Sequence, residues 1–118
     1  MSDSTVEIVV GETDFDFIAP IQDENGAAIN ITNYTFLLQG ESEDLPGKQI
    51  NVAGVILDAA LGLAKWPGIG DSDTYVSEAD LGSKQSALFR LKVRRTSPAG
   101  KVRYGKEMLW RWMKDPLT

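Results

Sequence analysis

Residues 87–94 read ALFRLKVR, and this stretch decides the fold. Apolar side chains occupy the odd positions from 87 to 93, and basic side chains occupy the even positions from 90 to 94. A period of two is typical of a β-strand that rests one face on a hydrophobic core. Residues 97–100 (SPAG) predict a turn, and residues 101–112 resume the alternation with Trp110 and Trp112 on the apolar side. We therefore expect two long strands joined as a hairpin.

Shorter segments of the same kind precede this hairpin. Residues 23–26 (DENG) are a strong turn signal, because Asn-Gly accepts positive φ at low cost. Residues 40–47 are too polar and too broken by glycine and proline to be other than a loop, and residues 70–83 read as a loop with one helical turn near 77–81. The expected strands are residues 6–10, 15–17, 29–31, 34–39, 49–53, 55–58 and 63–66, the last two joined by a reversal at 59–62.

Short alternating strands with turns at such spacing predict an all-β fold. The chain has 118 residues, which suits a single domain over 1–118 that buries roughly two thirds of its unfolded surface. We expect a β-sandwich of two antiparallel sheets with about seven to nine strands.

The composition removes the usual parts of most enzymes. There is no cysteine and no histidine, so thiol chemistry, the commonest metal ligand and the usual general base near neutral pH are all missing. No pair of carboxylates stands out as a general acid and its ionised partner. We expect no enzyme activity, no cofactor and no bound metal.

The N-terminal segment and the hydropathy disfavour export and membranes. Residues 1–10 (MSDSTVEIVV) lack the basic start and the longer apolar stretch of a secretion signal. No apolar run approaches the ~20 residues that cross a bilayer, and the net charge of −5 opposes binding to anionic lipid. The absence of cysteine fits folding in a reducing cytoplasm.

Charge is divided unequally along the chain. Residues 1–83 hold fifteen acids and two bases, a net −13, whereas residues 84–118 hold ten bases and two acids, a net +8. In one domain, such a split either neutralises itself between strands or presents opposite charges to neighbouring molecules.

The basic residues of the predicted hairpin are the candidate interaction site. If the two strands pair in step, six bases share one sheet face, and like charges placed opposite each other destabilise a sheet unless carboxylates border them. Glu7, Asp14 and Asp16 are the expected neighbours, and a partner molecule is the alternative source of acids. Nucleic acid is disfavoured, because the acidic first part of the chain opposes the positive field that it needs. The candidate residues are Arg90, Lys92, Arg94, Lys101, Arg103 and Arg111.

Two other groups of residues have simpler structural explanations. Trp66, Trp110 and Trp112 fall where core residues are expected, although an exposed tryptophan would suit an interface. The acids of residues 71–80 match no complete calcium-loop spacing and read as a solvated loop.

The order of these pieces resembles the immunoglobulin-like domain at the N-terminus of tailed-phage baseplate upper proteins and of related small virion proteins. The matching segments are 10–17 (VGETDFDF), 23–26 (DENG), 29–36 (INITNYTF), 60–66 (ALGLAKW) and 87–93 (ALFRLKV). The sequence departs from the family's pattern at Glu12, where the family has aspartate, and at Asn33, where its turn has glycine. Asn33 can still adopt the left-handed conformation.

The resemblance implies an immunoglobulin-like sandwich with a structural role in a tailed-phage virion, in the tail, baseplate or head. Its partners would be other virion proteins and further copies of the chain, assembled in the host cytoplasm. The family has no catalytic residues to carry over. Two alternatives stay open: a carbohydrate or host-surface binding module that uses an exposed tryptophan, and a phage-encoded cytoplasmic adaptor or inhibitor.

Overall fold

The computed structural model describes residues 5–115, which form nine strands and one short helix. In chain order the elements are β1 (Thr5–Val9), β2 (Phe17–Pro20), β3 (Thr35–Glu41), β4 (Gln49–Ala53), β5 (Val55–Asp58), β6 (Leu63–Trp66), α1 (Glu78–Leu81), β7 (Ser86–Thr96), β8 (Val102–Tyr104) and β9 (Met108–Met113). No helix in this part of the chain is long and apolar enough to span a membrane.

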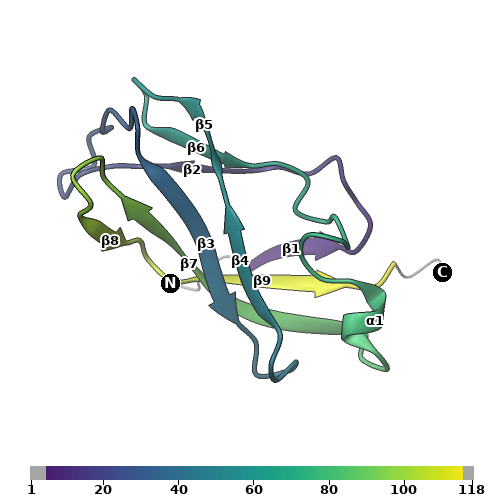
Figure 1. The fold of residues 1–118 in the computed structure, drawn as a ribbon. Coiled ribbons are helices and arrows are strands. Elements are labelled where there is room, and N and C mark those ends of the chain that lie inside the picture. Colours follow the sequence, from purple (N-terminus) through teal and green to yellow (C-terminus); the bar gives the residue numbers. More distant parts are fainter. Residues whose placement is uncertain (1–4, 116–118) are drawn as a thin grey trace.

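The strands form two sheets packed as a β-sandwich, which confirms the predicted fold class (Figure 1). The larger sheet has the order β1-β9-β7-β3-β4, with β8 also paired to β7, and the smaller sheet has the order β2-β6-β5. The smaller sheet therefore consists of the second, sixth and fifth strands of the chain, in that spatial order. This is how strands B, E and D pair in immunoglobulin-like domains, opposite a sheet that contains C, F and G.

The core lies where the alternation of β7 placed it. Ala87, Phe89 and Leu91 are fully buried, and Trp110 and Trp112 of β9 lie on the same inner face. The Phe89 ring meets the Trp112 ring edge to face, with the two centroids 5.1 Å apart. The long strands predicted from the sequence thus form one side of the hydrophobic core.

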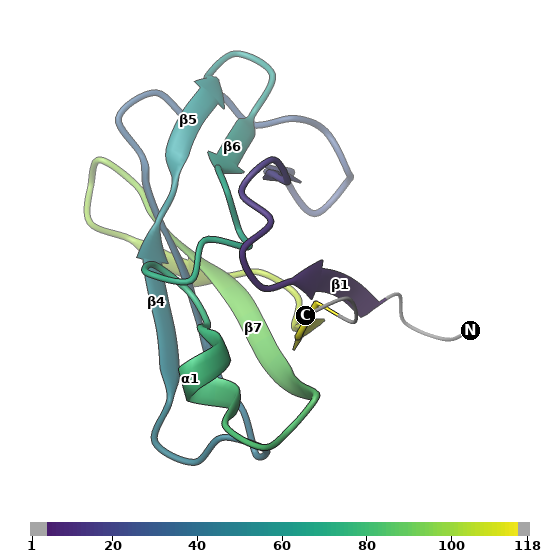
Figure 2. The same ribbon diagram turned by 90° about the vertical axis from the view of Figure 1, so that its right-hand side faces the viewer.

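Gly54 carries the chain from one sheet to the other in a single residue. It separates β4, at the edge of the larger sheet, from β5, at the edge of the smaller one (Figure 2). Its N–H donates to the carbonyl of Phe36 at 3.0 Å, and a Cβ at this position would lie 2.7 Å from the Trp66 ring. Only glycine lets the backbone approach the indole so closely.

Local turn chemistry also follows the sequence. Ser77 caps the helix with a complete capping box, in which its hydroxyl accepts from the Asp80 N–H and the Asp80 carboxylate accepts from the Ser77 N–H. This confirms the helical turn predicted near 77–81. Asn33 adopts a positive φ of 64°, which agrees with the left-handed conformation expected where the related turn has glycine.

Three expectations differ from the structure. The chain ends pair in parallel, β1 with β9, in a sandwich whose other pairs are antiparallel. The strand expected at 15–17 begins at Phe17, because residues 13–14 form a turn and leave Phe15 exposed. Residues 29–31 form no strand, although Ile31 is fully buried and its N–H bonds to the Ala59 carbonyl.

The final hairpin has a break that the alternation did not predict. Arg94 of β7 faces Tyr104 of β8, whereas Leu91 of β7 faces Met108 of β9. A strand continuing in step from Tyr104 would have placed Glu107 opposite Leu91 instead. The link between β8 and β9 therefore holds one extra residue. As a result, odd-numbered residues of β8 but even-numbered residues of β9 lie on the core side of the sheet.

Candidate protein-interaction surfaces

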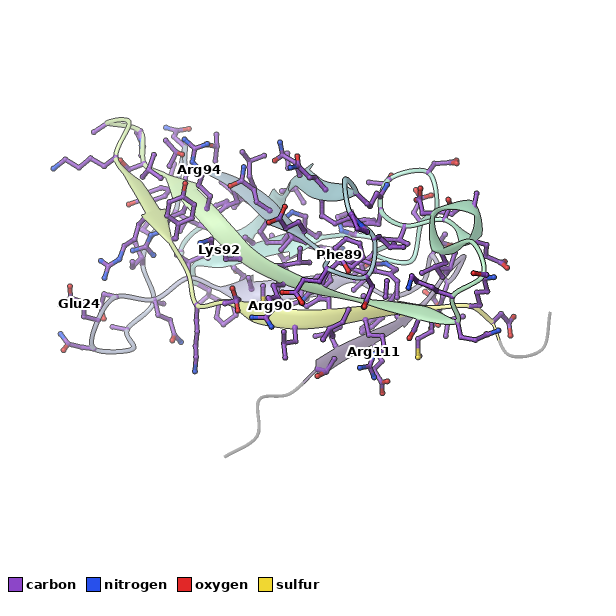
Figure 3. The ribbon with its side chains drawn as sticks, turned by 90° about the horizontal axis from the view of Figure 1, so that it is seen from below. Glu24, Phe89, Arg90, Lys92, Arg94 and Arg111 are labelled. Atoms are coloured by element: carbon purple, nitrogen blue, oxygen red, sulfur yellow. The ribbon has the colours of Figure 1, made fainter. Side chains whose placement is uncertain are left out.

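The outer face of the larger sheet carries four of the six candidate bases. The outward positions of β7 present Arg90, Lys92 and Arg94, because the residues between them point into the core. Arg111 of β9 lies opposite Leu88, an outward position, and so joins this face. We call these four residues the basic face, and Figure 3 shows them along β7 and the neighbouring strand.

Carboxylates neutralise one end of the basic face, where Arg90 and Arg111 lie. Arg111 lies 3.8 Å from Glu7 of β1, which confirms Glu7 as an expected neighbour. Arg90 lies 3.9 Å from Glu107 and directly across from Glu41 of β3. Glu41 is not among the predicted neighbours, because nothing local to residue 41 indicates that β3 would pair with β7.

The other two expected acids lie elsewhere. Asp16 pairs with Lys65 at 3.3 Å and accepts a hydrogen bond from the Gly68 N–H at 2.9 Å. That backbone bond, helped by Lys65, lowers the pKa of Asp16 below its ordinary value. Asp14 lies in the turn that leads from β1 to β2. The expectation that these two acids border the basic hairpin is therefore wrong for Asp16, which serves the smaller sheet.

The other end of the basic face, formed by Lys92 and Arg94, keeps its positive charge. No ion pair among residues 5–115 involves Lys92 or Arg94. The Lys92 ammonium lies 5.0 Å from the centre of the exposed Tyr104 ring, and the Arg94 Nε is buried with no hydrogen-bond partner in the described part of the chain. A hollow of about 550 Å³ lies alongside, between the bases Arg90 and Lys92 and the segment 41–44, which carries three acids.

Arg103 and Lys101 do not belong to the basic face. Arg103 lies opposite Arg95, which alternates with Arg94 and therefore points to the other side of the sheet. It reaches Glu24 at 3.5 Å, on the turn after β2. Lys101 lies in the exposed turn before β8. The predicted six-residue face was wrong for these two, because the extra residue before β9 changes the register of the hairpin.

The smaller sheet has an unusually apolar edge. Val55, Ile56 and Leu57 of β5 are 53%, 38% and 47% exposed, and Leu61 in the following turn is 59% exposed. β5 pairs on one side only, with β6. We call these four residues the apolar edge.

The tryptophans pack in the core, and the acidic loop makes local hydrogen bonds. Trp66, Trp110 and Trp112 are all fully buried, so none of them can stack on a sugar at the surface. Asp71 caps its own turn by accepting from Asp73 N–H and Thr74 hydroxyl. Among residues 5–115, no three carboxylates gather as a metal ion would require.

The chain is similar in fold to a solved structure, whereas no family model and no curated protein sequence matches it. Among solved structures, the chain is similar to the N-terminal domain of phage TP901-1 ORF48, with 14% sequence identity and a TM-score of 0.47. The match covers 95% of this chain and 85% of that one.

Proposed function

We propose that this chain is a non-enzymatic structural protein of a tailed-phage virion, joined to its neighbours by the apolar edge and by the basic face. The sequence motifs that resemble immunoglobulin-like domains of phage baseplate and virion proteins support the virion role. The two exposed surfaces support assembly as the mode of action.

The observation that carries the proposal is the composition of β5. Three successive apolar residues are typical of a strand covered on both faces, because a strand with one face in water alternates. In this fold β5 is instead an edge strand with Val55, Ile56 and Leu57 exposed. Natural proteins protect such edges with charges or cover them, so an exposed apolar edge marks a contact surface.

The basic face supplies orientation. Lys92 and Arg94 keep their charge while the acids on the first 83 residues give a neighbouring molecule a surface of opposite sign. Such complementary charges direct encounters and fix the arrangement of partners. A contact between different surfaces on successive copies closes into a ring when the rotation permits.

Light scattering across protein concentration tests the apolar edge. Val55→Glu should fold, because Val55 lies opposite Lys65, and should weaken self-association at least tenfold. Val102→Glu is the matched control, since Val102 is also an exposed strand valine, at 44%. Equal effects of the two substitutions on self-association would show that the apolar edge is not an assembly contact.

A second comparison tests the basic face. Arg90→Glu with Lys92→Glu should reduce assembly, whereas Lys84→Glu with Lys101→Glu makes the same change of charge at exposed positions outside that face. Association through the basic face should weaken in high salt, whereas association through the apolar edge should persist.

Antibodies against the chain test the virion role directly. They should label phage particles purified from the source strain. A protein that stays monomeric at every salt concentration and is absent from purified particles would overturn the proposal and favour an adaptor or inhibitor.

A further inference from the structure

A cleft of about 430 Å³ opens between the smaller sheet and the end of the final hairpin. Residues 17–24, which include all of β2, form one wall. The opposite wall has an apolar part, with Val93 and Met108, and a basic part, with Arg95, Arg103 and Lys106. The cleft is separate from the basic face, because Arg95 and Arg103 point to the other side of the larger sheet.

The wall formed by β2 is a free strand edge. β2 is the terminal strand of its sheet, and Ile21 N–H donates to Gly62 carbonyl on the side of β6. Backbone groups alternate in direction along an antiparallel strand, so those of Phe17 and Ala19 also face β6, while those of Ile18 and Pro20 face outward. The outward N–H and C=O of Ile18 and the C=O of Pro20 therefore have no strand beside them within the described chain.

The charge of the opposite wall is only partly balanced. Arg95 and Arg103 lie directly across from each other on β7 and β8, an arrangement that is unfavourable for like charges. Arg103 has Glu24 at 3.5 Å, and the Arg95 Nη1 donates to the Gln22 carbonyl at 3.4 Å. Lys106 adds a third positive charge in the exposed link to β9. Three bases therefore face two lining carboxylates, Asp23 and Glu24, and the cleft keeps a net positive charge.

We infer that this cleft binds an extended acidic segment of a partner protein, which adds to the free edge of β2 as a further strand. Strand addition obtains affinity from backbone hydrogen bonds and specificity from alternate side chains. Here the inward side chains of the added strand meet Phe17, Val93 and Met108, and acidic ones at the rim meet Arg95, Arg103 and Lys106.

Pro20 makes the edge selective. It cannot donate a backbone hydrogen bond, and proline at an edge strand discourages unspecific pairing. An added strand consequently depends on the N–H and C=O of Ile18 and on charge, which separates this site from a purely apolar sheet edge.

The test uses an eight-residue peptide that alternates glutamate and valine, with a lysine–valine peptide as the charge control. Fluorescence anisotropy should show binding of the acidic peptide at least tenfold tighter than that of the basic one, weakening as salt rises. Amide exchange of the full chain should show the Ile18 N–H becoming protected when the acidic peptide binds. Equal affinity for the two peptides would overturn the inference.

Matched variants separate strand addition from charge attraction. Ile18→Pro removes the outward N–H without removing a bond to β6, and should weaken binding about tenfold, whereas Ile18→Thr keeps the N–H and should bind nearly as the parent does. Lys106→Glu should weaken binding by a similar factor. Binding that survives Ile18→Pro, or tighter binding of the oligonucleotide dT8 than of the acidic peptide, would refute a strand-addition site.

Discussion

Trp110 and Trp112 lie two residues apart on β9, and both rings are fully buried. They differ in whether the indole N–H has a hydrogen-bond partner. The Trp112 indole N–H donates to the Ile69 carbonyl at 2.9 Å, whereas the Trp110 Nε1 is buried with no hydrogen-bond partner among the described residues. A buried donor without a partner carries a desolvation cost of about 1–3 kcal/mol. Two chemically identical side chains therefore contribute differently to stability.

Phenylalanine substitutions should expose this difference. Trp112→Phe leaves the Ile69 carbonyl without its donor and creates a cavity, whereas Trp110→Phe creates a cavity and removes an unpaired donor. We expect Trp112→Phe to lower the free energy of unfolding by about 1–2 kcal/mol more than Trp110→Phe does. Urea denaturation followed by circular dichroism measures both; an equal loss would contradict the assignment of the partners.

The raised pKa of the buried Tyr75 hydroxyl leads us to expect a loss of stability at alkaline pH. Burial raises its pKa from 10.0 to about 12, with a smaller contribution from Asp71. Above pH 10 the unfolded chain releases this proton while the folded chain keeps it, so stability falls as pH rises toward 12. The slope is about 1.4 kcal/mol per pH unit. Compared with the parent, Tyr75→Phe should lose less stability between about pH 9 and pH 11 in urea denaturation; the same loss in both proteins would assign the effect to other groups.

At the scale of the elements, Gly54 joins the two sheets. Gly54→Ala should destabilise the fold by about 2–4 kcal/mol, because the added methyl would meet the buried Trp66 ring at 2.7 Å and the ring has no room to move. Gly100→Ala is a suitable comparison, since it lies in an open turn with no atom near its Cβ and tests only the strain of its positive φ. Thermal unfolding would distinguish them, and a smaller shift for Gly54→Ala than for Gly100→Ala would contradict this reason.

Most elements could be predicted, because their signals are local. The alternation of residues 87–93 indicates which side chains of β7 are buried, and the capping box of Ser77 marks the start of α1. The misplaced part of the candidate site has a physical reason of another kind. The extra residue between Tyr104 and Met108 changes the register across strands, and a single-strand pattern carries no information on that pairing.

Partners on neighbouring strands of one sheet could not be predicted either. Nothing near Arg90 in the sequence indicates Glu41 as its neighbour, because the two residues meet only when β3 and β7 pair. Ile31 shows the opposite case, in which an apolar residue predicts burial correctly but its backbone belongs to no strand.

At the scale of the whole molecule, the surfaces lie on different sides of one sandwich. The basic face covers the outside of the larger sheet, the apolar edge follows β5, and the cleft opens beside β2. β2 and β5 are the two opposite edges of the smaller sheet. If the chain assembles as proposed, one copy offers separate positions for separate neighbours.

The parallel pairing of β1 with β9 also determines how the fold carries mechanical load. Thr5 lies beside Leu109 and Val9 beside Met113, so a pull applied at Thr5 and Met113 slides the two strands past each other. Their hydrogen bonds then share the force and must fail together, whereas an antiparallel hairpin pulled at its open end breaks them one at a time. In single-molecule stretching, we expect a distinct force peak when these two points are pulled, and a much lower one when Ser86 and Met113, the paired open end of β7 and β9, are pulled apart.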